Sequence, residues 1–123
     1  MGKRYQRRVS ELVHIRLSYL LERKSKDPRL AMVTITDVEV SPDVTLAKVY
    51  FSVLGGQEAR DEAQEGLKSA AGWLRRELGE HLRLRNIPEL VFRYDRSVER
   101  GERISAILDE LGLGDEEIDA GTS

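Results

Sequence analysis

Cysteine is absent from this 123-residue chain, and only three prolines and seven aromatic residues are present. Without thiols the protein has neither disulfides nor thiolate metal sites, which is compatible with a reducing, cytoplasmic compartment. The longest uninterrupted apolar run, Leu30 to Val33, is far too short for a membrane span or for the apolar core of a signal peptide. We therefore expect a soluble cytoplasmic monomer that is not exported and has no membrane partner.

The whole chain also lacks a large excess of either charge, because its net charge is only −2. Each end of the chain is nevertheless strongly charged. Residues 1–26 hold eight basic and two acidic residues, for a net charge of +6, and residues 109–123 hold six acidic residues and no base, for −6. A basic start and an acidic end are typical of a polyanion-binding protein, although acidic tails also occur on proteins without such a partner.

The first half of the sequence predicts a helix followed by a β-hairpin. Apolar residues at i, i+3 and i+4 spacing predict a helix over residues 5–24, which should end before Asp27-Pro28. Alternating apolar residues then predict two antiparallel strands, with a turn at Ser41-Pro42-Asp43. The alternation slips by one residue at Thr36-Asp37, which predicts a β-bulge.

The second half predicts a long helical stretch, a third strand and a last helix. Helical spacing runs from Ala59 to Leu82, and residues 90–94 alternate as a strand. Ser97 is the predicted N-cap of a helix that ends at Leu111. We expect residues 1–111 to form one domain with one core, and residues 112–123 to form an acidic, disordered tail.

Within the long helical stretch, Ala70-Ala71-Gly72 predicts a break or kink. A glycine inside a helix costs about 1 kcal/mol relative to alanine, so a compensating role is expected. A break would expose N–H groups that can bind a phosphate, and small residues would let a nucleic-acid strand approach. Taken alone, the three small residues favour the simpler interpretation of tight packing against the sheet.

The predicted order is therefore helix, strand, strand, helix, kink, helix, strand, helix. This order defines an α+β fold in which a three-stranded sheet packs on helices.

Enzyme chemistry is not indicated. His14 and His81 are each expected to lie alone on a helix, without a partner at metal-ligand spacing, and Gly55-Gly56 lacks the pattern of a phosphate-binding loop. We expect no catalytic residue, no metal and no cofactor. A small hydrolase would need a pocket that brings His14 or His81 to a carboxylate, and that alternative stays open.

Basic residues follow the predicted kink and also cluster near the start of the chain. Guanidinium groups bind phosphates in a bidentate manner, and Trp73 could stack on a base or lie in the core. Arg76, Glu80 and Arg83 could instead form a surface ion-pair ladder. The residues predicted to contact RNA are Arg4, Arg7, Arg8, Lys24, Lys26, Arg29, Ala70, Ala71, Gly72, Arg75, Arg76, Arg83 and Arg85.

The sequence resembles type II KH domains and, more closely, the bacterial ribosome-binding factor A family, over residues 3–111. Each matching piece is short, and their order and spacing make the resemblance specific. The matching pieces are Arg7-Arg8-Val9, Asp27-Pro28-Arg29, residues 33–43, Ala47-Lys48-Val49-Tyr50, Ala70-Ala71-Gly72, Leu84-Arg85, Pro88-Glu89-Leu90, Phe92-Arg93-Tyr94-Asp95 and Ser97.

This resemblance implies a non-catalytic assembly factor that binds the immature small ribosomal subunit and its rRNA. It further implies assistance in late maturation and 5′-end processing of that rRNA, and a part in cold adaptation. The Ala-x-Gly kink replaces the Gly-x-x-Gly loop that clamps single strands in other KH domains, so recognition through phosphates and RNA shape is expected. A protein–protein adaptor that contacts a ribosomal protein or an assembly GTPase is the main alternative. A double-stranded RNA-binding domain is a further alternative, but its helix-strand-strand-strand-helix order conflicts with the helical spacing before the third strand.

Overall fold

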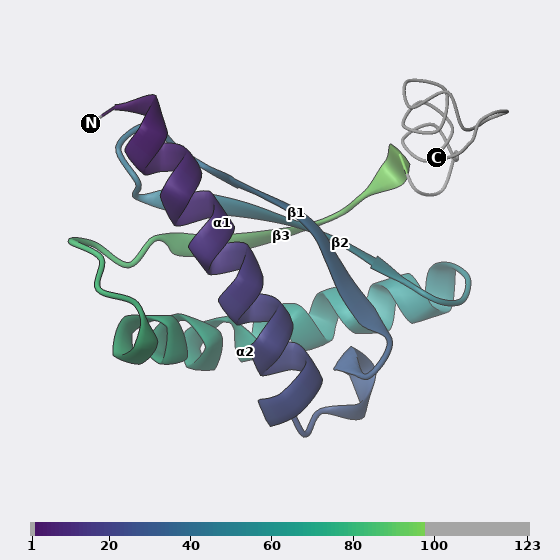
Figure 1. Ribbon diagram of the computed structural model, residues 1–123. Helices are drawn as coiled ribbons and strands as arrows, with labels where there is room; N and C mark the ends of the chain where they lie inside the picture. The colour runs from purple at the N-terminus through teal and green to yellow at the C-terminus, as the bar shows by residue number, and fades with distance from the viewer. Residues whose placement is uncertain (1, 98–123) are drawn as a thin grey trace, which may run out of the picture.

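The computed structural model describes residues 2–97, in which two long helices pack against a three-stranded sheet (Figure 1). Helix α1 spans Lys3–Tyr19 and helix α2 spans Gln57–His81. The strands β1, Val33–Val40, and β2, Leu46–Val53, are antiparallel, and β3, Glu89–Tyr94, pairs in parallel with β2. The strand order is β1-β2-β3. The predicted α+β class is confirmed.

Both helices bury apolar side chains in the same core as the strands. Val13 and Leu17 of α1 and Leu67 and Leu74 of α2 are fully buried there, together with Phe51 of β2. No helix of the described part is long and apolar enough to cross a membrane. The predicted last helix and acidic tail lie outside the described residues, as does the predicted domain boundary at residue 111.

Helix α1 continues into a π-helical turn, Leu20–Lys24, in which the Ser25 amide donates to the Leu20 carbonyl at 2.9 Å. The predicted end of this helix before Asp27-Pro28 is confirmed. A short 3₁₀ turn, Pro28–Leu30, follows, and the Asp27 side chain caps it by accepting from the Arg29 amide.

The β-bulge predicted at Thr36-Asp37 is confirmed. Ile35 pairs with Phe51 and Asp37 pairs with Tyr50, so Thr36 has no partner residue on β2. The extra residue keeps the apolar side chains on both sides of the bulge in the core, because it shifts the alternation by one.

The predicted break at Ala70-Ala71-Gly72 is wrong, because α2 is one α-helix from Gln57 to His81. Its buried face continues on both sides of Gly72, through Leu67 before it and Leu74 after it. Full burial of one leucine stabilises by about 1.5–3 kcal/mol, which exceeds the cost of about 1 kcal/mol for a single helical glycine. The free N–H groups expected at a break are therefore not present.

The N-cap predicted at Ser97 is also wrong. Arg96 and Ser97 are already helical, and Oδ1 of Asp95 accepts hydrogen bonds from the Ser97 amide at 3.1 Å and the Ser97 hydroxyl at 2.6 Å. Asp95 is therefore the capping residue, since its carboxylate satisfies an N–H group of the first turn.

Candidate RNA-binding surface

The basic side chains predicted to bind RNA are all exposed, but they fall into two classes. Eight of them form no side-chain hydrogen bond or ion pair with a described residue. These side chains could therefore bind phosphate oxygens without breaking an internal contact. The eight are Arg4, Arg7, Arg8, Lys24, Lys26, Arg76, Arg83 and Arg85.

Arg29 belongs to the second class, because its guanidinium is already paired. Nη2 lies 2.7 Å from Oδ2 of Asp27, and Nε donates to both oxygens of that carboxylate at 3.1 Å. These hydrogen bonds hold the pKa of Asp27 below its ordinary value and raise the pKa of Arg29, with Glu65 and Glu62 of α2 adding to the second effect. Arg29 therefore holds the loop after α1 rather than offering an open cation.

The guanidinium of Arg75 likewise forms hydrogen bonds within the protein. Its Nη2 donates to the Ile87 carbonyl at 2.9 Å, and its Nε lies 3.3 Å from the carbonyls of Ile87 and Pro88. These contacts tie the loop between α2 and β3 to the helix, so Arg75 positions the loop that carries Arg83 and Arg85.

Contacts among the described residues bear on the alternative roles of the neighbouring residues. Trp73 is half-buried and packs against the core, so its ring is partly committed to the fold. Neither Arg76 nor Arg83 forms an ion pair with a described residue, which argues against the surface ladder with Glu80.

Gly72 lies on the exposed side of α2, at a hollow between this helix and β3. The hollow has a volume of about 440 Å³ and is lined by Ala71, Gly72, Arg75, Glu89 and Leu90. A Cβ added at Gly72 would meet no atom of the described residues within 4 Å. Internal packing therefore does not require a glycine here, whereas close approach of a ligand backbone would.

The close-packed glycine of α2 is instead Gly66, which the sequence alone did not single out. A Cβ at Gly66 would lie 3.0 Å from Cδ2 of Leu30 and 3.1 Å from Cβ of Arg29. The interpretation of small residues as a packing device thus applies to Gly66 and not to Gly72.

A second hollow, of about 520 Å³, continues from the first along the outer edge of β3, and the two share Ala71 and Leu90. Glu89 and Asp95 direct their amides toward β2, so the parallel ladder turns the backbone groups of Leu90 and Phe92 outward. Gln64 covers one of these groups by donating to the Phe92 carbonyl at 3.0 Å.

Three residues of this second hollow, Gln64, Lys68 and Arg93, were missed by the sequence reasoning. The signal that could have found them is helical spacing. Gln64 and Lys68 precede Ala71 and Arg75 at i, i+4, i+7 and i+11, and therefore share one face of α2.

The open face of the sheet is a poor surface for a polyanion. Lys48 and Arg93 lie among Asp37, Glu39 and Glu89, so positively and negatively charged side chains are mixed across the strands. The Tyr50 hydroxyl at its centre donates to Glu39 at 3.4 Å, and burial followed by the nearby Glu39 carboxylate raises the pKa of this tyrosine. RNA contacts are therefore expected from the helices and the loop after α2.

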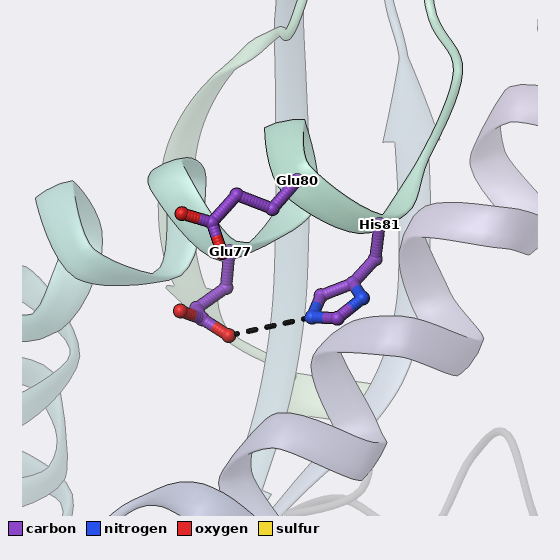
Figure 2. A group of neighbouring side chains, drawn as sticks. All are labelled: Glu77, Glu80 and His81. Carbon is purple, nitrogen blue, oxygen red and sulfur yellow. Dashed lines mark ion pairs between the residues drawn. The ribbon is translucent and has the colours of Figure 1, made fainter.

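The expectation that each histidine lies without a carboxylate neighbour is wrong for His81. Figure 2 shows His81 beside Glu77 and Glu80 on the last turns of α2. One ligand atom of each residue lies within 4.8 Å of those of the other two. His81 and Glu77 form an i, i+4 ion pair at 3.6 Å, and both Glu80 and His81 are exposed. No further described residue encloses these side chains, so among the residues that the structure describes they form a surface ion pair rather than a metal centre.

His14 has a structural contact on α1. Its Nε2 lies 3.1 Å from the Ile35 carbonyl, while Gln6 donates to the Val40 carbonyl at 2.6 Å and Ser10 accepts from the Val40 amide at 3.3 Å. These three side chains cover the free edge of β1, which would otherwise invite pairing with another strand.

This chain is similar to known proteins over most of its length. A family model described as ribosome-binding factor A matches residues 5–108. The ribosome-binding factor A of Geotalea daltonii is 47% identical over 112 residues, which cover 91% of this chain and 90% of that relative. The ribosome-binding factor A of an Azoarcus species is 47% identical over 118 residues, with 94% of each chain covered.

Solved structures give the same result for the fold. The crystal structure of ribosome-binding factor A from Thermus thermophilus matches with a TM-score of 0.66 and 25% identity, covering 75% of this chain and 97% of that one. A Thermus thermophilus homology model, fitted into the cryo-EM map of a 30S complex of that protein, matches with a TM-score of 0.57 and 23% identity, covering 78% and 97%. This chain belongs to the ribosome-binding factor A family.

Proposed function

We propose that this protein is a non-catalytic assembly factor that binds the immature small ribosomal subunit through phosphates of its rRNA. Its task is to assist late maturation of that rRNA, including processing at the 5′ end. The observation that supports this most directly is the family match over residues 5–108. The relatives carry a ribosome-binding name, and this chain offers cations suited to such a partner.

Internal contacts of the predicted cations support a choice among them. We assign phosphate binding to the eight cations without internal partners and give Arg29 and Arg75 positioning roles, because their guanidinium groups hold loops. With six to ten phosphate contacts, raising the salt concentration from 50 to 200 mM would lower the affinity for RNA by about 10³- to 10⁵-fold. Gly72 adds a place where an RNA backbone can approach α2 closely, since no described atom fills the space beside it.

Charge reversal in pairs tests this assignment. The double variants Arg7→Glu/Arg8→Glu and Arg76→Glu/Arg83→Glu should each reduce co-sedimentation with immature small subunits severalfold, while circular dichroism stays unchanged. A matched control, Arg23→Glu/Lys48→Glu, makes the same change in charge outside the proposed surface and should bind normally. Equal loss in all three variants would mean that only net charge matters, and full binding in all three would remove the assignment.

A protein–protein adaptor is the second candidate, and the exposed acidic first half of α2 favours it. Glu58, Asp61, Glu62 and Glu65 are exposed there, and such a surface suits a basic ribosomal protein or an assembly GTPase. Nuclease treatment separates the two functions. Binding through RNA is lost after digestion of the rRNA, whereas binding through a protein survives.

A further inference from the structure

The first residues of β1 direct backbone hydrogen-bonding groups away from the sheet. The Asp95 amide donates to the Phe51 carbonyl at 2.8 Å, so the backbone groups of Phe51 point toward β3. Ile35 pairs with Phe51 in the antiparallel ladder, and the backbone groups of Ile35 therefore point away from β2. Because alternate residues of a strand share this direction, those of Val33 point outward as well.

The cover that α1 provides for the free edge of β1 begins only at the Ile35 carbonyl. His14 contacts that carbonyl, and the other side chains of α1 contact Val40, beyond the bulge. Among the described residues, the Val33 carbonyl and the Ile35 amide have no hydrogen-bond partner. The start of β1 is therefore an open strand edge, which is a template for pairing with another chain.

One residue of an added parallel strand would satisfy both of these groups. In a parallel ladder, a residue donates its amide to one carbonyl and accepts from the amide two positions further along the neighbouring strand. The β2–β3 ladder shows the first of these bonds, where the Glu89 amide donates to the Thr45 carbonyl at 2.9 Å. Such a strand would leave the contact between His14 and Ile35 intact.

A hollow of about 450 Å³ between the start of β1 and the end of α1 is open to the side chains of an added strand. It shares Ser18 with a second hollow, of about 530 Å³. Met32 and Leu54, which line the first hollow, are 54% and 71% exposed, and Ile15, which lines the second, is 68% exposed. Apolar side chains of a partner strand would bury these three side chains.

Charge complementarity favours a basic protein segment over RNA at this edge. The ionisable residues that line the two hollows are Glu11, His14 and Glu22, and neither hollow is lined by a lysine or an arginine. Both glutamates are exposed, and Glu22 pairs with the largely exposed Arg23 at 3.5 Å. An ion pair this exposed contributes little, so a basic side chain of a partner can replace it. Phosphates would instead meet two carboxylates.

We propose that the start of β1 is a docking site for an extended, basic segment of another protein, which adds to the sheet as a further strand beside Val33 and Ile35. Apolar residues of the segment occupy the hollow against Met32 and Leu54, and a lysine or arginine of the segment meets Glu22. This surface goes beyond the proposed RNA contacts, because it includes none of the eight cations without internal partners.

A short blocked peptide of alternating lysine and valine serves as the probe for the full-length protein. It should slow the solvent exchange of the Ile35 amide severalfold, measured by NMR, whereas the exchange of the Thr34 amide, which faces β2, should not change. The amide signals of Met32 and Leu54 should shift at the same peptide concentrations. The same peptide with N-methylated backbone amides cannot form the ladder and should produce neither effect.

Variants that line the hollow test the side-chain contacts. Met32→Gln/Leu54→Gln replaces two exposed apolar side chains without a change in charge and should weaken peptide binding severalfold, while circular dichroism stays unchanged. Glu22→Lys should weaken binding as well. The matched control Glu58→Lys makes the same change in charge at an exposed residue of α2 and should bind the peptide normally. Equal weakening by the two lysine variants would mean that the peptide follows net charge alone, and the proposal would be wrong.

Three other results would overturn the proposal. The first is an unchanged exchange rate of the Ile35 amide with the peptide in large excess. The second is slower exchange of that amide when a single-stranded RNA oligonucleotide replaces the peptide. The third is protection that rises with protein concentration without any peptide, which would assign the edge to a second copy of this chain. Because the assay contains no ribosomal subunits, its failure does not bear on RNA binding by the eight cations.

Discussion

Replacing Gly66 or Gly72, two of the three glycines inside α2, with alanine separates a packing role from a binding role. Alanine is favoured over glycine in a helix by about 1 kcal/mol. At Gly72 no atom of the part that the structure describes lies within 4 Å of the added Cβ, so the full gain in stability should appear. Gly72→Ala should therefore stabilise the protein by about 1 kcal/mol, which raises the unfolding temperature by about 4–8 °C for a domain of this size.

At Gly66 the same gain is opposed by a clash. The added Cβ would lie 3.0 Å from Leu30 Cδ2 and 3.1 Å from Arg29 Cβ, and Leu30 is only 2% exposed. Overpacking a buried site costs about 1–3 kcal/mol, so Gly66→Ala should be about 1–3 kcal/mol less stable than Gly72→Ala. Urea and thermal unfolding, followed by circular dichroism, measure both differences.

The more stable of the two variants, Gly72→Ala, should be the one that binds small subunits less tightly. The methyl group of Gly72→Ala enters the hollow beside Ala71 and Arg75, so co-sedimentation with immature small subunits should weaken although the fold is more stable. Gly66→Ala should bind normally once folded. If both variants shift stability equally, the packing argument for Gly66 is wrong. If Gly72→Ala binds as tightly as the parent protein, no RNA strand passes close to this glycine.

Three further changes test individual contacts. Arg75→Met should lower the free energy of unfolding by about 1 kcal/mol in urea, because it removes the hydrogen bonds to two loop carbonyls, whereas Arg76→Met should leave it unchanged; equal effects would contradict the positioning role. Asp95→Ala should cost about 1–3 kcal/mol in the same assay, since the hydroxyl of the bulge and the first-turn amide lose their acceptor, and a smaller loss would mean that water replaces it. The pKa of Asp27, measured by NMR, should lie below its ordinary 3.8, because Arg29 donates to the carboxylate. The stabilisation from this depressed pKa is present above pH 3.8 and lost as pH falls through the lower folded value, so the difference in unfolding temperature between the parent and Asp27→Asn should vanish there. A difference that persisted at lower pH would refute the linkage.

Local patterns in the sequence determined the elements and one irregularity of the sheet. Side chains alternate strictly along a strand, so the slip at Thr36 could be satisfied only by an extra residue, and the bulge followed. The same reasoning predicted α1 and its end before Pro28, because helical spacing and the restriction before proline act within a few residues.

The sequence also determined which residues carry positive charge, but not which of them are available to bind a phosphate. Arg75 and Arg76 are adjacent and chemically identical, yet only Arg75 meets carbonyl oxygens, twelve and thirteen residues further along the chain. Arg29 meets its carboxylate two residues away, in a turn whose shape depends on Leu30 packing against α2. Which cation remains open to a phosphate is thus a property of the loops around it.

Tertiary structure alone decided the role of the glycines in α2. Gly72 has the local sequence expected of a break, but the burial of Leu74 and Leu78 in the shared core keeps the helix continuous. Gly66 has no local signal at all, and only the approach of the loop after α1 makes its missing side chain necessary. Periodicity is determined by neighbours along the chain and can be read from the sequence. Close approach is determined by residues far along the chain, whose positions depend on how the whole core packs.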